Sequence, residues 1–321
     1  MDTTVELKGA RYRFEVLRGA ELAAVIPLFR DAFRGRKFSV GWLQRKYSCE
    51  QDGLAGFACV AFDERGQAAG SVGLLPWPAR FEGRVEAAGQ MVDVATGTAH
   101  RGRGLFVALA ERVRELCEEA GVGFLYGFPN EEAYPIWVHK LGYDHSDDLL
   151  EFRLPVRTLW VEKLSHRAGP LRGLYERYAR RTLNAHAPDD PRLENSLGRD
   201  GFACIERDDS FHEYKAAFGG SRVLAVDGGR AWVNARHGLL IGDLEASSDA
   251  ELDQTTGALA RLAARLGLHQ IVFQVSKDTR LAAYFSNRFP VSHELPVIYR
   301  NIRSGIPRDK LRFTLGDLDN F

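Results

Sequence analysis

The chain has 321 residues, of which 45% are apolar and 27% are charged, and its 43 basic residues balance its 43 acidic residues. This composition is typical of a soluble globular protein and excludes a disordered chain. The zero net charge disfavours a dedicated nucleic-acid-binding protein, because no overall positive field would attract phosphate backbones. At about 150 residues per domain, the length predicts roughly two domains.

The sequence has no pattern typical of a metal site, a disulfide scaffold or a membrane segment. Its four cysteines are scattered, without a C-x-x-C pair or a histidine at metal-ligand spacing. No stretch approaches the roughly 20 apolar residues of a transmembrane helix, and the first residues lack the apolar core of a signal peptide. We therefore expect a cytoplasmic protein that binds no metal, no nucleic acid and no membrane.

In chain order, the first half predicts a helix, an antiparallel meander and then alternating strands and helices. Leu22, Val25, Ile26, Phe29 and Phe33 are spaced as one face of a helix over residues 19–33. The segments after this helix are predicted as strands at 57–62, 71–75, 91–96, 124–128 and 149–154, helices at 105–121 and 134–140, and turns at 63–66 and 82–83.

The second half repeats this order of elements without repeating the sequence. Residues 160–183 are predicted to be helical, and residues 184–199 are polar with two prolines. We divide the chain into a first domain at 1–155, a helical connector at 156–199, and a second domain with a C-terminal tail at 200–321. In the second domain, strands are predicted at 223–226, 230–234, 239–244, 269–276 and 295–300, and helices at 252–266 and 279–289.

The most informative segment is VDVATGTAHRGRGLFVALAERV, residues 92–113. A predicted strand leads into the loop 101–104, and the loop opens directly into a helix at Leu105. Glycines allow the backbone to approach a ligand closely, and the unpaired amides of a first helical turn attract anions. The segment therefore predicts a phosphate-binding loop. A tight turn with two solvated arginines is the alternative explanation.

This loop resembles the Q/R-x-x-G-x-G/A motif of the GNAT superfamily of N-acetyltransferases, which lies between a strand and a helix. Arg101, Gly104 and Phe106 occupy the positions of the motif, with Phe106 in place of the usual small residue. The resemblance covers roughly residues 11–155. A second GNAT signature, N-x-x-A…K-x-G-F/Y, is matched in FPNEEAYPIWVHKLGY by Asn130, Ala133, Lys140, Gly142 and Tyr143.

The resemblance implies an α/β (α+β) fold of two GNAT-like domains, each with a mixed, mostly antiparallel central sheet flanked by helices. It also implies acetyl-CoA as co-substrate, with its pyrophosphate on the loop amides and its pantetheine arm along the strand 94–96. The acetyl group would pass directly to an amine in a ternary complex, without a cysteine nucleophile. The implied cofactor-binding residues are Val94, Ala95, Thr96, Arg101, Gly102, Arg103, Gly104, Leu105, Phe106 and Asn130.

Asp93 is the predicted catalytic carboxylate. Attack on a thioester needs a neutral amine, so a base must accept a proton from the amine, directly or through water. Strand alternation points Asp93 away from Val92 and Val94, and we expect it to attract a cationic amine and to deprotonate it. An aspartate tied to the backbone or to an arginine is the structural alternative.

Tyr134 is the predicted general acid. Many relatives have a tyrosine just before the K-x-G-F element, but this chain has Val138 there, which cannot donate a proton. Tyr134 lies one helical turn earlier and is the nearest substitute. His139 is a second candidate, and core packing is the alternative role for Tyr134. Trp137 is expected to pack.

The second domain is expected to bind no CoA. The segment equivalent to the loop reads GDLEASSDAELDQ, and its acidic residues Glu245, Asp249 and Glu251 would repel a pyrophosphate at the helix start. We interpret residues 200–303 as a degenerate GNAT-like copy that shapes the acceptor pocket. The C-terminal tail is expected to pack on the surface. A tail that reaches the catalytic domain is the alternative.

The predicted function is therefore transfer of an acetyl group to a primary amine of a small molecule, such as an amino sugar, an amine metabolite or an antibiotic. A protein amine is not excluded as the acceptor. The alternatives are an aminoacyl or longer-chain acyl transferase and a non-catalytic CoA-binding sensor or scaffold. The intact RGRG loop favours CoA, and the neutral charge balance disfavours tRNA. A homodimer is left open.

Overall fold

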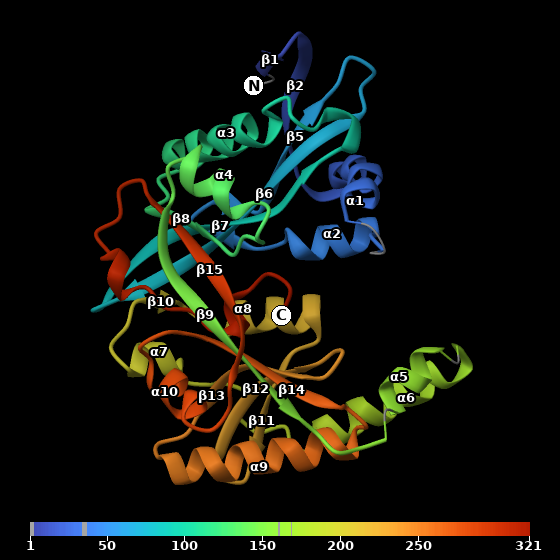
Figure 1. Ribbon diagram of the computed structural model, residues 1–321, viewed down its shortest axis with the longest axis vertical. Coiled ribbons are helices and arrows are strands. Elements are labelled where there is room, and N and C mark those ends of the chain that lie inside the picture. Colours follow the sequence, from blue (N-terminus) through green and yellow to red (C-terminus); the bar gives the residue numbers. More distant parts are fainter. Residues whose placement is uncertain (1–2, 34–36, 160, 168) are drawn as a thin grey trace. The chain divides into compact units, whose positions relative to one another are not determined.

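The computed structural model describes residues 3–33, 37–159, 161–167 and 169–321. The chain forms two compact units, each built from two segments (Figure 1). Unit 1 contains Met1–Ser146 and Pro296–Asp309, and unit 2 contains Asp147–Leu295 and Lys310–Phe321. These limits differ from the predicted ones at residues 155 and 199, because compactness depends on which strands pair and not on their order along the chain. Of the predicted helical stretch 160–183, residues 160 and 168 lie outside the described part.

Unit 1 is a mostly antiparallel sheet with the strand order β1-β2-β5-β6-β7-β8-β15. Within it only β7 and β8 pair in parallel among the described ladders. Its elements are β1 (Thr3–Leu7), β2 (Ala10–Leu17), η1 (Gly19–Val25), α1 (Ile26–Ala32), α2 (Val40–Lys46), β3 (Glu50–Gln51), β4 (Leu54–Ala55), β5 (Phe57–Phe62), β6 (Ala68–Phe81), β7 (Arg84–Thr96), η2 (Thr98–His100), α3 (Leu105–Glu119), β8 (Phe124–Gly127), α4 (Tyr134–His139), the start of β9 (Asp144–Pro155) and the end of β15 (Val291–Asn301).

The helices of unit 1 cover both faces of this sheet (Figure 1). Leu105, Leu109, Val113 and Cys117 of α3 recur every four residues and enter one buried cluster with strands β2, β5, β6 and β7. The predicted helix over 19–33 begins as the 3-10 helix η1 and becomes α-helical only at Ile26. Pro27 explains the change, because proline has no N–H and fits only the first turn of an α-helix.

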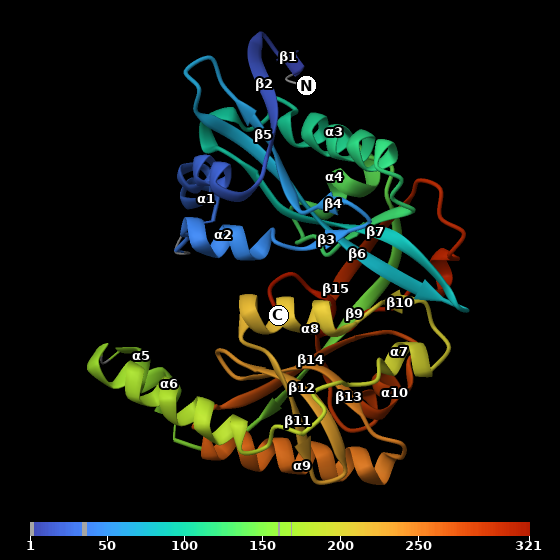
Figure 2. The same cartoon turned by 180° about the vertical axis from the view of Figure 1, so that it is seen from behind.

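Unit 2 has the strand order β9-β14-β13-β12-β11, in which β13 and β14 are parallel. Figure 2 shows the long helix α9 beneath these strands. The elements are α5 (Val161–Arg167), α6 (Gly169–Asn184), α7 (Ser196–Arg199), β10 (Cys204–Ile205), α8 (Asp209–Gly219), β11 (Arg222–Val226), β12 (Gly229–Ala235), β13 (Leu239–Glu245), α9 (Asp249–Arg265), β14 (Gln270–Ser276), α10 (Arg280–Ser286) and η4 (Leu315–Asp317). A further short helix, η3 (Arg308–Lys310), spans the limit between the units.

The two units share one order of strands. In each, an antiparallel meander leads into a helix and then into a strand parallel to the last meander strand, as β7-α3-β8 and as β13-α9-β14. The antiparallel partner of β8 is β15, from the end of the chain, and the antiparallel partner of β14 is β9, from the first half. Each unit therefore completes its sheet with a strand that belongs, in sequence, to the other half.

The C-terminal tail is part of the core of unit 2. The Phe321 side chain is fully buried, and its ring centroid lies 4.7 Å from that of Trp232. Arg207, whose side chain is 1% exposed, forms ion pairs with Asp243 at 2.5 Å and with Asp317 of the tail at 2.8 Å. The expectation of a tail packed on the surface is therefore wrong, because five apolar tail residues and one carboxylate are buried, namely Leu311, Phe313, Leu315, Leu318, Phe321 and Asp317.

Candidate functional site

Strand β7 is open along its second half. Its ladder with β8 runs from Ala88–Phe124 to Met91–Gly127, so residues 92–96 lie beyond it. On the other side the register with β6 shifts between Ser71 and Gly73. Asp93, at φ +48°, lies in the resulting bulge. A bulge leaves a residue out of the ladder. Because the ladder with β8 ends at Met91, residues 92–96 have an edge on that side against which an extended ligand can pair.

The loop 101–104, called the Arg-Gly loop below, joins this strand to α3. Gly102 and Gly104 adopt φ values of +74° and +88°, in the left-handed region that glycine tolerates best. Gly104 is the N-cap of α3 and provides no side-chain cap, and the first turn contains no acidic residue. The first amides of α3 are therefore available to an anion.

Three side chains from distant parts of unit 1 fasten the loop and the 3-10 turn before it. The Asp31 carboxylate of α1 accepts hydrogen bonds from the backbone N–H of Thr98 at 2.7 Å and from its hydroxyl at 3.1 Å. The Tyr12 hydroxyl lies 3.1 Å from Nδ1 of His100. Lys8 Nζ donates to the carbonyl oxygen of Gly102 at 2.7 Å. No local sequence pattern predicts these three contacts, which join residues 67 to 94 positions apart.

These features surround one cleft of about 600 Å³ that lies entirely within unit 1. Of the ten residues predicted to bind the cofactor, all except Arg103 line it. The full lining is Lys8, Ala32, Phe33, Val94, Ala95, Thr96, His100, Arg101, Gly102, Gly104, Leu105, Phe106, Val107, Asn130, Glu132, Ala133, Ile136 and Lys140.

The charge of the cleft suits an anionic ligand with an apolar arm. Lys8, Arg101 and Lys140 contribute positive charge, and Glu132 is the single carboxylate in the lining. A Cβ built on Gly102 or Gly104 would meet no atom within 4 Å, so the loop backbone faces open space. Phosphate groups bind well to such a combination of glycine backbone, helix amides and arginine. The residues present therefore fit the pyrophosphate of CoA.

Asp93 is held by two side chains of the α2 region. Its carboxylate accepts from Lys46 Nζ at 2.7 Å and from the Tyr47 hydroxyl at 2.8 Å. The Lys46 side chain is 3% exposed and that of Asp93 is 11% exposed. Tyr47 crosses β6 at Gly73, where a Cβ would lie 2.1 Å from the tyrosine oxygen. The bulge interrupts the strand alternation from which the direction of the Asp93 side chain was predicted. The structural alternative tied Asp93 to the backbone or to an arginine, and the observed ion-pair partner is a lysine.

Tyr134 lies outside the lining of the cleft. Its hydroxyl is 3.2 Å from Nδ1 of His145, and its ring packs against the buried core of unit 1. Trp137 is 2% exposed and packs between the rings of Phe106 and Tyr143, which confirms the prediction that it packs. The hydrogen-bond partner of Tyr134 is thus His145, whereas those of Asp93 are Lys46 and Tyr47.

Asn130 has a local structural task as well as a place in the cleft. Its side-chain oxygen accepts a hydrogen bond from the backbone N–H of Ala133 at 2.9 Å, which fixes the turn before α4. Because this hydrogen bond holds the Asn130 side-chain oxygen, it also fixes the orientation of the side-chain amide nitrogen. Glu131 and Glu132 in the same turn are exposed, and α4 itself begins only at Tyr134.

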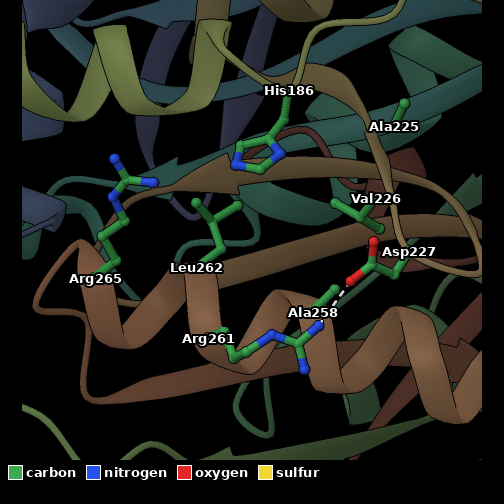
Figure 3. Close-up of a pocket in the computed structure, with 8 residues that line it drawn as sticks. All are labelled: His186, Ala225, Val226, Asp227, Ala258, Arg261, Leu262 and Arg265. Atoms are coloured by element: carbon green, nitrogen blue, oxygen red, sulfur yellow. Dashed lines mark hydrogen bonds and ion pairs between the residues drawn. The ribbon is translucent and has the colours of Figure 1, made fainter.

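A second hollow, of about 400 Å³, lies within unit 2 between β11 and α9 (Figure 3). Arg261 and Asp227 pair across its rim at 2.8 Å, with both side chains more than two-thirds exposed. Leu262 and Ala258 of α9 form the apolar part of its wall, with His186 on the opposite side. It has neither a glycine loop nor a helix start, so the cleft of unit 1 is the better candidate for a phosphate-bearing ligand.

In the part of the chain that the structure describes, no helix combines the length and the apolar character needed to cross a bilayer. Within the same residues, no three histidine, cysteine, aspartate or glutamate side chains gather as metal ligands.

Comparisons with known proteins agree with this geometry. Residues 13–146 match the family model of the acetyltransferase (GNAT) domain. Among solved structures, a probable N-acyltransferase from Enterococcus faecalis V583 aligns with a TM-score of 0.59 and 13% identity, over 91% of this chain and 73% of that chain. A putative acetyltransferase from Pyrococcus horikoshii aligns with a TM-score of 0.56 and 12% identity, over 95% and 94%. Eis1 from Mycobacterium abscessus aligns with 0.53 and 14%, over 94% and 82%. No curated protein matches the chain in sequence.

Unit 1 therefore carries a GNAT acetyltransferase domain. At identities of 12 to 14%, the solved structures establish a shared fold and nothing about the substrate.

Proposed function

We propose that the chain transfers an acetyl group from acetyl-CoA to a primary amine of a small molecule. The observation that supports this most directly is the union of the Arg-Gly loop, the uncapped start of α3 and the open half of β7 in one cleft. A volume of about 600 Å³ is in the range of small-molecule sites. A cytoplasmic location stays a prediction from the sequence alone.

In this proposal the amides after Gly102 and the Arg101 guanidinium hold the pyrophosphate, and residues 94–96 pair with the pantetheine arm. Acetyl-CoA supplies an activated thioester. A backbone N–H at the bulge would donate to the thioester oxygen and stabilise the negative charge that develops during attack. The amine loses a proton and the departing sulfur gains one, so the chain must provide a route for each.

We propose that Asp93 acts by holding the bulge, in addition to any proton transfer. Because Lys46 already compensates its charge at 2.7 Å, a second cation gains little from it. Asp93→Asn keeps the shape and the hydrogen bond from Tyr47, whereas Lys46→Met leaves the carboxylate free to attract an amine. If Asp93 is the general base, Asp93→Asn should lower kcat and remove the acidic limb of the pH–rate profile. A positioning role predicts that Asp93→Asn lowers kcat only slightly, that Lys46→Met lowers it more because the ion pair is lost, and that the pH–rate profile is unchanged in both variants.

Tyr134 is proposed as the general acid because it lies one helical turn before Val138, the position at which many GNAT relatives have a tyrosine. Its hydroxyl pairs with His145 outside the cleft lining, so the role requires a rotation of the side chain or a bridging water. Tyr134→Phe with a His145→Gln control separates the two outcomes. A catalytic hydroxyl predicts a loss of kcat in Tyr134→Phe alone, whereas packing predicts little change in either variant.

We also propose that unit 2 is a degenerate GNAT-like copy that binds no CoA. Its β13-α9-β14 order supports the relation, and the acidic first turn of α9 supports the loss of phosphate binding.

The experiment is a thiol-release assay with acetyl-CoA and a panel of amino sugars, polyamines, aminoglycosides and peptide amines, with longer acyl-CoA thioesters in parallel. The proposal predicts release that depends on a small amine and that falls sharply in Arg101→Ala. Release only with longer acyl groups would replace acetyl by another acyl donor. Tight CoA binding without release on any amine would favour a sensor.

A further inference from the structure

The turn between β1 and β2 places a lysine at a position where lysine is unfavourable. Lys8 and Gly9 are the two central residues of a hairpin closed by the pair Leu7–Ala10, and both have positive φ, at +50° and +77°. Such two-residue turns prefer Asn, Asp or Gly at the first position. A left-handed conformation is unfavourable for a residue with a Cβ. Glycine would suit the turn better, so we expect the lysine side chain to have a role of its own.

The side chain of Lys8 reaches the cleft of unit 1. Its Nζ donates to the carbonyl oxygen of Gly102 at 2.7 Å, and Lys8 is exposed and lines the cleft beside Arg101. Gly102 C=O belongs to the same planar peptide as the N–H of Arg103, and the two point in opposite directions. Holding the carbonyl oxygen therefore also fixes the direction of one N–H of the loop.

The ammonium keeps further hydrogen-bonding capacity. A lysine carries three N–H donors, and the bond to Gly102 uses one of them. The next residue on the same hairpin that touches the loop is Tyr12, through His100, which also lines the cleft. The hairpin thus contacts the Arg-Gly loop at Gly102 and the 3-10 turn before it at His100, from the N-terminal edge of the sheet.

We propose that Lys8 is a binding residue for the pyrophosphate of CoA and that it positions the Arg-Gly loop through Gly102. The inference rests on the proposed function, since it takes CoA as the ligand. The pyrophosphate is the assigned contact because Gly102 belongs to the loop whose amides face the cleft. The other lysine of the cleft lining, Lys140, belongs to a different element, since it is the C-cap of α4.

The test is calorimetric titration of the full chain with CoA and with 3′-dephospho-CoA. Lys8→Gly removes the side chain while it relieves the turn, so loss of binding cannot be attributed to a strained or unfolded hairpin. We expect Lys8→Gly and Lys8→Met to weaken both ligands about tenfold, which corresponds to about 1.4 kcal/mol, and to reduce the salt dependence of Kd. Lys8→Arg should restore most of the affinity. Arg11→Met, which removes one charge from the neighbouring strand outside the lining, is the matched control and should bind as wild type does.

The outcomes separate this inference from the proposed function. If the wild-type chain binds neither ligand, the CoA assignment itself fails. If wild type binds and both Lys8 variants bind equally well, only the role of Lys8 is overturned. A loss confined to CoA and absent with 3′-dephospho-CoA would contradict the assignment to the pyrophosphate. Equal losses in Arg11→Met would reduce the effect to net charge and would also overturn the proposal.

Discussion

Helices α3 and α9 follow the last meander strand of their units, yet their first turns are built in opposite ways. Gly104 begins α3 with no side-chain cap, and its first turn has no acidic residue. Ser248 caps α9 by accepting from the N–H of Glu251 at 3.2 Å, and the Glu251 carboxylate accepts from the N–H of Ser247 at 2.6 Å. The same topology thus leaves the first amides of α3 available to an anion in unit 1, whereas the start of α9 in unit 2 is capped by its own side chains.

This difference shows what a helix start can be used for. A side-chain N-cap satisfies one of the orphan amides internally and stabilises the helix. An uncapped glycine start gives up that stability and leaves the amides and the helix dipole to a ligand. The contrast supports ligand binding in unit 1 and a structural task for unit 2, and four variants test it, from the largest expected effect to the smallest.

Val107→Glu gives α3 a first-turn carboxylate like that of Glu251 in α9. Val107 is the third residue of α3, as Glu251 is of α9, and it lines the cleft. Two like charges about 4 Å apart at an effective dielectric of 20 repel by about 4 kcal/mol, so we expect acetyl-CoA affinity to fall more than a hundredfold. The first-turn carboxylate should not destabilise the helix. Val107→Gln is the neutral control and should retain most of the affinity. Unaltered affinity of Val107→Glu in calorimetry would refute anion binding by the first amides of α3.

Arg207→Leu tests whether the buried charges of unit 2 serve stability. The substitution leaves Asp243 and Asp317 buried without their cation, and such a loss costs about 3 to 5 kcal/mol. Urea unfolding should show this loss, while the folded variant should bind acetyl-CoA as wild type does. Loss of CoA affinity at unchanged stability would assign these residues to a ligand instead.

His212→Phe should alter the pH dependence of stability. Burial, followed in importance by the charge of Arg207, lowers the pKa of His212 from 6.5 to about 4. Between these values the unfolded chain binds a proton that the folded chain does not, so stability falls as pH drops from 6.5 towards 4. The full difference corresponds to roughly 3 kcal/mol.

The check for His212 is urea unfolding of wild type and variant at pH 7.5 and at pH 5. The two should differ little in pH dependence above 6.5, and the loss on acidification should be smaller in His212→Phe, whose ring can still pack against Trp232. An equal loss in both chains would show that His212 is protonated in the folded state.

Ser248→Ala should have the smallest effect. Removing an N-cap hydroxyl costs about 1 kcal/mol, and the acidic residues Asp249 and Glu251 would still exclude a phosphate. Thermal unfolding should therefore shift by a few degrees while acetyl-CoA stoichiometry stays at one per chain. A second binding event in this variant would show that only the cap had kept unit 2 from binding CoA.

Local patterns in the sequence predicted much of the fold. The turns at 63–66 and 82–83 and the helix starting at Leu105 were predicted where the structure has them, because hydrophobic period and turn residues act over a few positions. Strands β1 and β2 and helix α8 were missed. The exchange of β9 and β15 could not be predicted, since strand partners are chosen by packing across the whole chain.

The site, like the fold, could be predicted where it depends on local sequence patterns. The Arg-Gly loop and the strand before it have local signatures, and their residues line one cleft. The residues that fasten the loop, Lys8, Tyr12 and Asp31, come from distant elements and have no signature of their own. Asp93 was recognised, but its lysine partner and the bulge depend on α2 and β6, which only the folded chain brings to it.

The most direct test of the central claim is calorimetric titration of the full chain with acetyl-CoA, for wild type, Arg101→Ala and Arg103→Ala. The account predicts one site per chain with a Kd in the micromolar range, about −8 kcal/mol. It predicts at least a tenfold loss in Arg101→Ala, whose side chain lines the cleft, and a smaller loss in Arg103→Ala, whose side chain does not. Absence of binding by the folded chain, or equal affinity in all three proteins, would contradict it.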